Sequence, residues 1–201
     1  MVFLAKKDIQ RLYFQDKRSL QEISKIIGVS THTICYWMDT YKLPRRNRSD
    51  ALYIKYNPNG NPFMCKNLVS HKDWFLFGLG IGLYWGEGTK SNTHSVRLGN
   101  TDPHLIKMFL LFLKKCYEID EKKLHFGLQV FRDMSAVDAK EFWKKHLNIE
   151  EKQFQKIIIT PTLGVGTYRK KTQYGVLTIY FNNKKLRDIL VGEIEKMKKI
   201  R

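Results

Sequence analysis

The chain has 201 residues, 43% of them hydrophobic, which is enough for one or two folded domains and excludes a disordered protein. Lys and Arg number 36 against 19 acidic residues, and the net charge of +17 indicates a polyanionic partner. Nucleic acid is the most common such partner, and an anionic membrane surface is the alternative. No apolar stretch reaches the ~20 residues that span a bilayer. The three cysteines are scattered, so we expect a cytoplasmic protein of a reducing compartment, with no membrane partner.

Residues 6–48 have the pattern of two helices joined by a tight turn. Ser19 is placed to cap the first helix, with Glu22 as its capping-box partner. Gly28 follows where a left-handed residue closes the turn, and Ser30 caps the second helix. The alternative is an ordinary helical hairpin with a polar face. The block resembles the helix-turn-helix modules of transposon resolvases, and this resemblance implies binding to double-stranded DNA.

The second of these helices and the segment after it carry side chains suited to DNA. Hydroxyl, imidazole and phenol groups on the first turns of the helix can reach base edges in a major groove. Pro44 then ends the helix, and the arginines that follow suit a minor groove or phosphates. The candidate DNA-binding residues of this part are Thr31, His32, Thr33, Tyr36, Arg45, Arg46 and Arg48.

Turn-forming residues gather in 57–62, where little would hold a core together. We therefore expect a helix-turn-helix domain with a basic arm over 1–50, a linker over 51–70 and a second domain over 71–201. The excess of positive charge is spread along the whole chain, so it is not the charge of a detachable tail.

The segment 74–90 is apolar and rich in glycine. Its spacing fits neither the G-x-G-x-x-G dinucleotide fingerprint nor the Walker A loop, so we expect no nucleotide cofactor. Gly78, Gly82 and Gly86 instead lie four residues apart, on one line along a helix. Each glycine costs ~1 kcal/mol in a helix relative to alanine. Close packing of this line against another helix would offset that cost, and the large apolar residues around it predict a helix buried on nearly every side.

The stretch from Gly80 to Gly88 resembles the nine-residue motif that names the LAGLIDADG homing endonucleases. The matching positions are Gly82, Gly86, Glu87 and Gly88, whereas Gly80 and Trp85 depart from the motif. In that family the motif helix forms a dimer or pseudo-dimer interface, and the acid at its foot binds divalent metal ions. The resemblance therefore implies a homodimer with Gly78, Gly82 and Gly86 at its interface and Glu87 as a ligand of Mg²⁺ or another divalent metal.

The order of the later elements is similar to the family core, which is αββαββα with a saddle-shaped antiparallel sheet. We predict strands over 93–98, 123–132, 156–160 and 175–181, and helices over 103–116, 135–148 and 185–199. This order fits the family if the helix over 135–148 is an insertion. The expected fold class is α+β, an N-terminal helix-turn-helix followed by a LAGLIDADG-type domain.

The resemblance implies a sequence-specific, metal-dependent endonuclease that hydrolyses phosphodiester bonds of double-stranded DNA. Glu87 would be catalytic, with Asn100 in the water network and Lys198 or Lys199 as the active-site lysine. DNA would lie across the sheets of both protomers, on Lys90, Arg97, Lys156, Arg169, Lys170, Lys171 and Gln173. For the run 168–174 the alternative is a solvated turn.

Two other functions suit the same expected fold. A non-cleaving transcriptional regulator would bind DNA without hydrolysing it, and an RNA maturase would use the basic surface without needing Glu87. The presence of the acid favours cleavage. The six histidines show neither H-x-x-x-H spacing nor clustering with cysteine, so we expect no zinc site.

Overall fold

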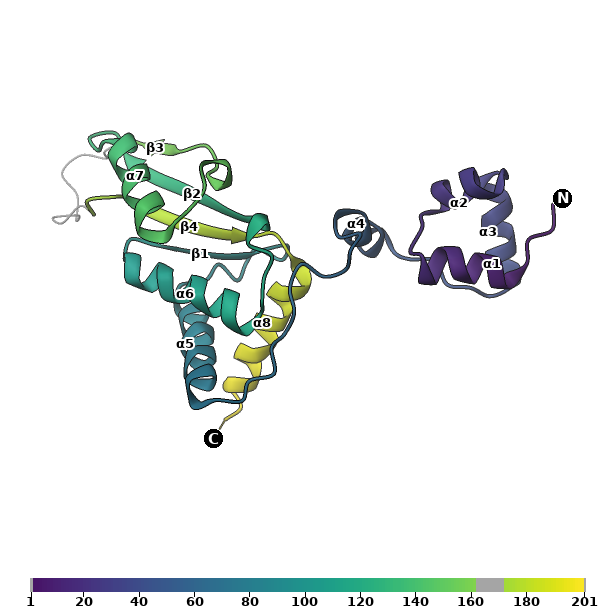
Figure 1. Ribbon diagram of the computed structural model, residues 1–201, viewed down its shortest axis with the longest axis horizontal. Helices are drawn as coiled ribbons and strands as arrows, with labels where there is room; N and C mark the ends of the chain where they lie inside the picture. Colours follow the sequence, from purple (N-terminus) through teal and green to yellow (C-terminus); the bar gives the residue numbers. More distant parts are fainter. Residues whose placement is uncertain (1, 162–171, 201) are drawn as a thin grey trace. The chain divides into compact units, whose positions relative to one another are not determined.

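The computed structural model describes residues 2–161 and 172–200. The chain forms two compact units, residues 1–61 and 62–201 (Figure 1). The division between them falls inside the turn-forming segment 57–62. None of the helices in the described ranges is long and apolar enough to cross a membrane.

The first unit is built from short helices. Its elements are α1 (Lys6–Gln10), a π turn η1 (Arg11–Gln15), α2 (Leu20–Ile27), α3 (Thr31–Thr40) and α4 (Arg48–Tyr56). The core forms between α1, α2 and α3, where Ile9, Ile23 and Ile34 are fully buried. α4 is not among the predicted elements; it begins after the cap Asn47 and contributes no buried residue.

Local hydrogen bonds set the turn between α2 and α3. The Ser19 hydroxyl accepts a hydrogen bond from the Glu22 N–H (3.2 Å), and the Glu22 carboxylate accepts one from the Ser19 N–H (2.8 Å). Gly28 has a φ of +77°, a left-handed conformation that favours glycine, and turns the chain toward α3. The Ser30 hydroxyl accepts a hydrogen bond from the Thr33 N–H (3.1 Å). The two helices and the turn between them are therefore confirmed, but the second helix ends at Thr40, where the chain turns through the left-handed Lys42 (φ 53°) before it reaches Pro44.

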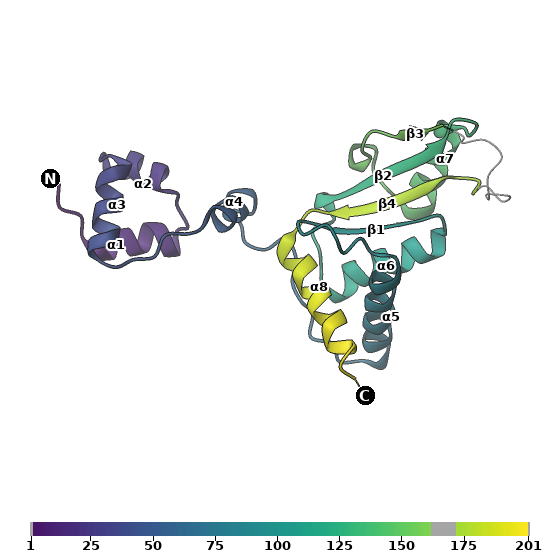
Figure 2. The same cartoon turned by 180° about the vertical axis from the view of Figure 1, so that it is seen from behind.

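The second unit is an α+β domain with one four-stranded sheet, in the strand order β1–β4–β2–β3 (Figures 1 and 2). Its elements are α5 (His71–Glu87), β1 (Val96–Asn100), α6 (Pro103–Cys116), η2 (Glu121–Lys123), β2 (Leu124–Phe131), α7 (Ala136–Leu147), η3 (Glu151–Gln153), β3 (Ile158–Thr160), β4 (Val176–Phe181) and α8 (Lys184–Met197). The α+β class and the helix between β2 and β3 agree with the prediction.

The sheet is mixed. β4 pairs antiparallel with both β1 and β2, whereas β3 runs parallel to β2. The expectation of a fully antiparallel sheet is therefore wrong at the β3 edge. The physical reason is α7, because a helix that crosses between two neighbouring strands returns the chain to the end where the first strand began. The chain from β2 through α7 to β3 is thus a βαβ unit.

A second difference concerns the chain between α5 and α6. The family order implies two strands there, but the structure has β1 and one isolated bridge between Gly88 and Leu98. A Cβ atom on Gly88 would lie 2.3 Å from the Tyr84 ring, so only glycine lets the end of α5 meet the sheet directly. The segment 89–95 has no regular structure. The αββαββα order is not reproduced in this part of the chain.

The core of the second unit lies between the sheet and its helices. α5, α6 and α8 are drawn on one side of the sheet in both ribbon views (Figures 1 and 2), and α7 packs against β2 and α6. Alternate strand residues point into this core, among them Leu98, Phe126 and Ile179, which are at most 2% exposed. The residues between them are half-exposed and form the opposite face of the sheet.

Residues 62–70 belong to the second unit. Phe63 is buried in its core. The N–H of Met64 donates to the carbonyl oxygen of Tyr117 (2.9 Å), and that of Lys66 donates to the carbonyl oxygen of Cys116 (3.0 Å). The expected linker over 51–70 is therefore shorter in the structure, because α4 occupies its start and this segment its end.

Candidate nucleic-acid interface and acidic site

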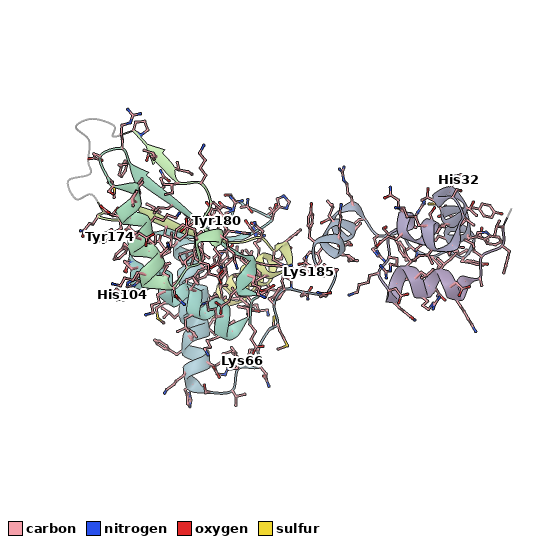
Figure 3. All side chains as sticks on the ribbon, turned by 45° about the horizontal axis from the view of Figure 1, so that its top comes forward. His32, Lys66, His104, Tyr174, Tyr180 and Lys185 are labelled. Carbon is pink, nitrogen blue, oxygen red and sulfur yellow. The ribbon has the colours of Figure 1, made fainter. Side chains whose placement is uncertain are left out.

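The half-exposed face of the sheet carries polar side chains in a row across three strands. Arg97 of β1 is in register with Tyr180 of β4, which is in register with His125 of β2. Figure 3 labels Tyr180 on the sheet. The Arg97 guanidinium carbon lies 5.2 Å from the centroid of the Tyr180 ring, a cation–π contact that holds the charge over this face. The row presents one cation and two hydrogen-bonding rings, about 5 Å apart from strand to strand.

The next row of the same face contains two glycines. Gly99 and Gly127 flank Thr178. A Cβ atom on Gly99 would lie 2.7 Å from the Thr178 hydroxyl, and one on Gly127 would lie 2.9 Å from the Tyr180 ring. The glycines therefore leave room for the Thr178 and Tyr180 side chains. The result is a low, polar sheet face of the kind that a nucleic-acid backbone can approach.

The line of glycines on α5 is not used by the chain's own packing. A Cβ atom on Gly78, Gly82 or Gly86 would meet nothing within 4 Å among the described atoms, and Gly82 and Gly86 are exposed. Large aromatic side chains flank the line, with Phe75 72% and Trp85 42% exposed. The prediction of a helix buried on nearly every side is therefore wrong for this face of the monomer.

Gly80 is the glycine of α5 that packs inside the chain. A Cβ atom there would lie 2.0 Å from the ring of Phe112 on α6. This close approach places α5 against α6 and leaves the line of Gly78, Gly82 and Gly86 facing away from that contact. The packing of α5 against α6 therefore requires a residue without a side chain at position 80.

Glu87 is the last residue of α5 and is exposed. Within residues 2–161 and 172–200 its carboxylate forms no hydrogen bond or ion pair. The neighbouring Lys90 does not pair with the Glu87 carboxylate. Its ammonium instead donates to the carbonyl oxygen of Trp85 (2.6 Å) and so caps the end of the helix. The acid is left with its charge directed to solvent or to a ligand.

The other predicted catalytic residues have partners of their own. The Asn100 side-chain oxygen accepts hydrogen bonds from the N–H groups of Thr101 (2.7 Å) and Asp102 (2.9 Å), in the turn before α6. The Lys198 ammonium lies 2.7 Å from a Glu195 oxygen and 5.9 Å from the Trp85 ring centroid. Lys199 is exposed. The described structure therefore shows no hydrogen bond or ion pair between these side chains and Glu87.

The remaining candidate DNA contacts of the second unit are in part outside the described residues. Lys156 and Gln173 are exposed, on the approaches to β3 and β4. Arg169, Lys170 and Lys171 lie outside the described residues. Arg97 is therefore the predicted DNA contact that the structure places on the open sheet face.

The candidate DNA contacts of the first unit divide into exposed and engaged groups. Thr31 and His32 are exposed on the first turn of α3, and Figure 3 labels His32 on the surface of this unit. Tyr36 is 46% exposed, whereas Thr33 is half-buried with its hydroxyl 3.0 Å from that of Ser30. In the arm, Arg48 is the exposed first residue of α4. Arg45 pairs with Asp39 at 3.3 Å, and the Arg46 guanidinium is bonded within the unit.

Sequence reasoning missed His125 and Tyr180 as members of the candidate interface. The alternation of apolar and polar residues along 123–132 and 175–181 places both on the exposed face of a strand, so a signal for them exists. Their position beside Arg97 depends on the pairing order of the strands, which no local pattern records.

Comparisons of this chain with protein-family models, with curated proteins and with solved structures yield no match.

Proposed function

We propose that this protein is a DNA-binding, metal-dependent endonuclease of the homing type that acts as a homodimer. The observation that carries the proposal is the position of Glu87. The Glu87 carboxylate is exposed at the end of α5 and has no partner among the described residues. The line of glycines on the same helix also has no neighbour among the described atoms of the chain. A second copy of the same helix would use both features at once.

A homodimer gives the glycine line of α5 a partner. Two such helices can approach closely where side chains are absent, at Gly78, Gly82 and Gly86, and the flanking Phe75 and Trp85 would be buried at the sides. A two-fold axis that runs along the two helices would bring the two copies of Glu87 to the same end of the pair. A double-strand break needs two reacting centres, so one motif per chain suits a dimer.

Glu87 fits a divalent cation only as part of such a pair. Magnesium takes several oxygen ligands, usually one or two carboxylates together with water and phosphate oxygens. Among the described residues no three His, Cys, Asp or Glu side chains gather to hold a metal ion, so one chain offers Glu87 alone. The two Glu87 carboxylates would hold the cation against the DNA backbone. When bound, the cation would supply charge for the phosphoryl oxygens and acidify a bound water.

The residues of the chain would position the DNA. Arg97, Tyr180 and His125 offer a cation and hydrogen-bonding groups on the open sheet face, which suits phosphates and base edges. The net charge of +17 favours the duplex electrostatically over the whole chain. The exposed start of α3, with Thr31 and His32, would extend the footprint from the first unit.

A non-cleaving DNA-binding regulator is the second candidate function. One observation favours it: the Asn100 and Lys198 side chains bind partners other than the acid. A regulator needs the basic surface and the open sheet but no reacting centre. An RNA maturase would share these requirements and differs in its nucleic acid.

The experiment compares the protein with its Glu87→Gln variant on a duplex selected from a randomised library in Mg²⁺. The substitution keeps the size of the side chain and removes the charge that holds a cation. We expect cleavage to fall at least ~10³-fold, a barrier increase of about 4 kcal/mol. Binding, measured by gel shift with Ca²⁺, should persist or tighten, because two acids no longer repel the phosphates.

The Glu118→Gln variant is the matched control, since Glu118 is also an exposed acid of the second unit. It should cut at the wild-type rate. Wild-type protein that binds DNA without ever cutting it would decide for the regulator, and preferential binding to RNA would decide for the maturase.

A further inference from the structure

Arg187 makes long-range hydrogen bonds that join α8 to the segment after α5. Its Nη2 donates to the carbonyl oxygen of Lys90 (2.6 Å), and its Nε donates to the carbonyl oxygen of Asn92 (3.1 Å). Its Nη1 lies 3.1 Å from a carboxylate oxygen of Asp188, and the side chain is only 15% exposed. One guanidinium thus holds two carbonyl groups of a segment that has no regular structure of its own.

The same segment is fixed from its other side by Asn92. The Asn92 side-chain oxygen accepts hydrogen bonds from the N–H groups of His94 (3.0 Å) and Ser95 (2.9 Å) and from the Ser95 hydroxyl (2.9 Å). The Ser95 oxygen in turn accepts a hydrogen bond from Arg97 Nε (2.7 Å). A continuous chain of polar contacts therefore runs from Arg187 to the Arg97 side chain on the open sheet face.

The segment also joins the two parts of the candidate site. Glu87 ends α5 immediately before it, and Arg97 stands on the strand immediately after it. The Lys90 residue that Arg187 holds by its carbonyl also caps α5 with its ammonium, at the carbonyl oxygen of Trp85. At its start the segment is held by the bridge at Gly88 and by a backbone hydrogen bond from the Thr89 N–H to the Arg97 carbonyl oxygen (2.9 Å). Beyond these backbone contacts it has no ladder, so the position of residues 90–95 depends on the side-chain contacts.

The location of Arg187 in α8 is unfavourable for the helix itself. The first turns of α8 carry Lys184, Lys185 and Arg187 and no acid before Asp188. Positive charge near the N-terminus of a helix opposes the helix dipole. An arginine placed there, with its side chain largely buried against another segment, serves a contact outside its own helix.

We propose that Arg187 is a positioning residue, which fixes the segment 88–95 and thereby sets the position of Glu87 relative to Arg97. The inference rests on the proposed function for the role of those two residues, but the fixing of the segment is a property of the protein without DNA. Arg187 does not touch the reacting atoms. It acts through the backbone of Lys90 and Asn92.

The test begins with amide hydrogen exchange on the free protein. In the wild type, local opening of the segment must break the two hydrogen bonds from Arg187 to the carbonyl oxygens of Lys90 and Asn92. The Arg187→Met variant lacks these bonds, so we expect its amides of Thr89 and Ser95 to exchange at least about tenfold faster. The paired amides of β2 and β4 should keep their wild-type rates. Unchanged exchange over 88–95, or an equal acceleration over the whole sheet, would overturn the inference.

Further variants distinguish the loss of the hydrogen-bond geometry of Arg187 from the loss of its charge and from misfolding of the protein. Arg187→Lys keeps the charge but cannot bridge two carbonyl groups in a fixed fork, so it should also accelerate exchange; wild-type behaviour of this variant would contradict the inference. Asn92→Ala breaks the network from its other end and should accelerate the same amides, which keeps the test valid if Arg187→Met fails to fold. Arg132→Met, at an exposed arginine outside the network, should leave the segment unchanged.

A second readout links the segment to activity. If the wild type cuts DNA, Arg187→Met should lower kcat about 10- to 100-fold and leave KM within about threefold, because misplaced groups cost rate more than binding. An equal loss of kcat and gain in KM would point to a general structural role and overturn the inference. Wild-type protein without any cleavage would refute the proposed function instead, while the exchange experiment would still decide the positioning role.

Discussion

Arg45 and Arg46 are adjacent in the basic arm but have different environments. The Arg46 guanidinium lies 4.0 Å from the Tyr13 ring centroid and donates to the carbonyl oxygens of Lys17 and Arg18 at 3.2 Å each. The Arg46 N–H also donates to the Tyr13 hydroxyl (2.7 Å). Arg45 forms one ion pair in which the two side chains are 49% and 60% exposed. Arg46 therefore holds the arm to the first unit, and Arg45 remains available to phosphates.

This difference predicts unequal losses of stability for two matched variants. Arg46→Met should destabilise the first unit by about 1–2 kcal/mol, because it removes several charged hydrogen bonds and a cation–π contact. Arg45→Met should cost less than about 0.5 kcal/mol, as for an exposed ion pair. Urea unfolding of a fragment of residues 1–61, followed by the fluorescence of Trp37, measures both. Equal stability of the two variants would contradict a structural role for Arg46.

At the scale of single elements, α5 has a well-capped N-terminus and an exposed face lined by glycines. Its N-terminus is a reciprocal capping box between Ser70 and Asp73, and Lys66 adds an ion pair to Asp73 at 3.2 Å. Hydrogen bonds from the Ser70 hydroxyl and backbone, followed by the Lys66 ammonium, lower the pKa of Asp73 to about 2. The ionised acid therefore stabilises the folded state more than the unfolded state.

The pH dependence of stability follows from that shift. The stabilisation by ionised Asp73 is fully present above its unfolded pKa of about 4 and is lost as the pH falls toward about 2. We expect the melting temperature of the wild type to fall more steeply between pH 5 and pH 2 than that of Asp73→Asn. Asp138→Asn is the control, because Asp138 follows the cap Ser135 of α7 at the same spacing without a reciprocal capping box. Parallel pH profiles for the wild type and Asp73→Asn would contradict the prediction.

The exposed face of α5 predicts a change with opposite signs in two measurements. Gly82→Leu meets no atom within the chain and replaces a poor helix former, so the monomer should gain up to about 1 kcal/mol in stability. The same leucine would hold two copies of the helix apart, so a dimer should become a monomer. Light scattering gives the mass and thermal unfolding the stability.

Gly80→Leu provides the contrast within the same helix. A side chain there overlaps the Phe112 ring, so this variant should lose stability whatever the oligomeric state. A Gly82→Leu protein that keeps the wild-type mass would show that the glycine line does not form a dimer interface.

At the scale of the whole molecule, the division of the chain predicts where it can be cut. A fragment of residues 62–201 retains every buried residue of the larger core, including Phe63. A fragment of residues 71–201 lacks Phe63 and the backbone hydrogen bonds to Tyr117 and Cys116. We expect the first fragment to fold and the second to be at least about 3 kcal/mol less stable, as for the loss of a buried phenylalanine.

Circular dichroism and urea unfolding distinguish the two fragments. If both have the same stability, residues 62–70 do not contribute to the core and the longer linker of the sequence prediction is correct. If neither folds, the two units depend on each other.

Much of the local structure was predictable from neighbouring residues. The capping box of Ser19 and Glu22, the left-handed Gly28 and the start of α6 at Asp102 and Pro103 depend on atoms within three or four positions of one another. The α+β class also follows from the local pattern, because periods of 3.6 and 2 residues alternate along the second unit.

The tertiary structure alone decided the rest, because it depends on residues that are distant in sequence. The direction of β3 is set by the path through α7, and the register of Arg97 with Tyr180 by the order of the strands. Gly80 and Gly82 look alike in the motif, yet Phe112 on another helix makes one of them internal and leaves the other exposed. The bonds from Arg187 to the segment after Glu87 cross 95 and 97 residues, a distance over which composition and spacing carry no information about contact.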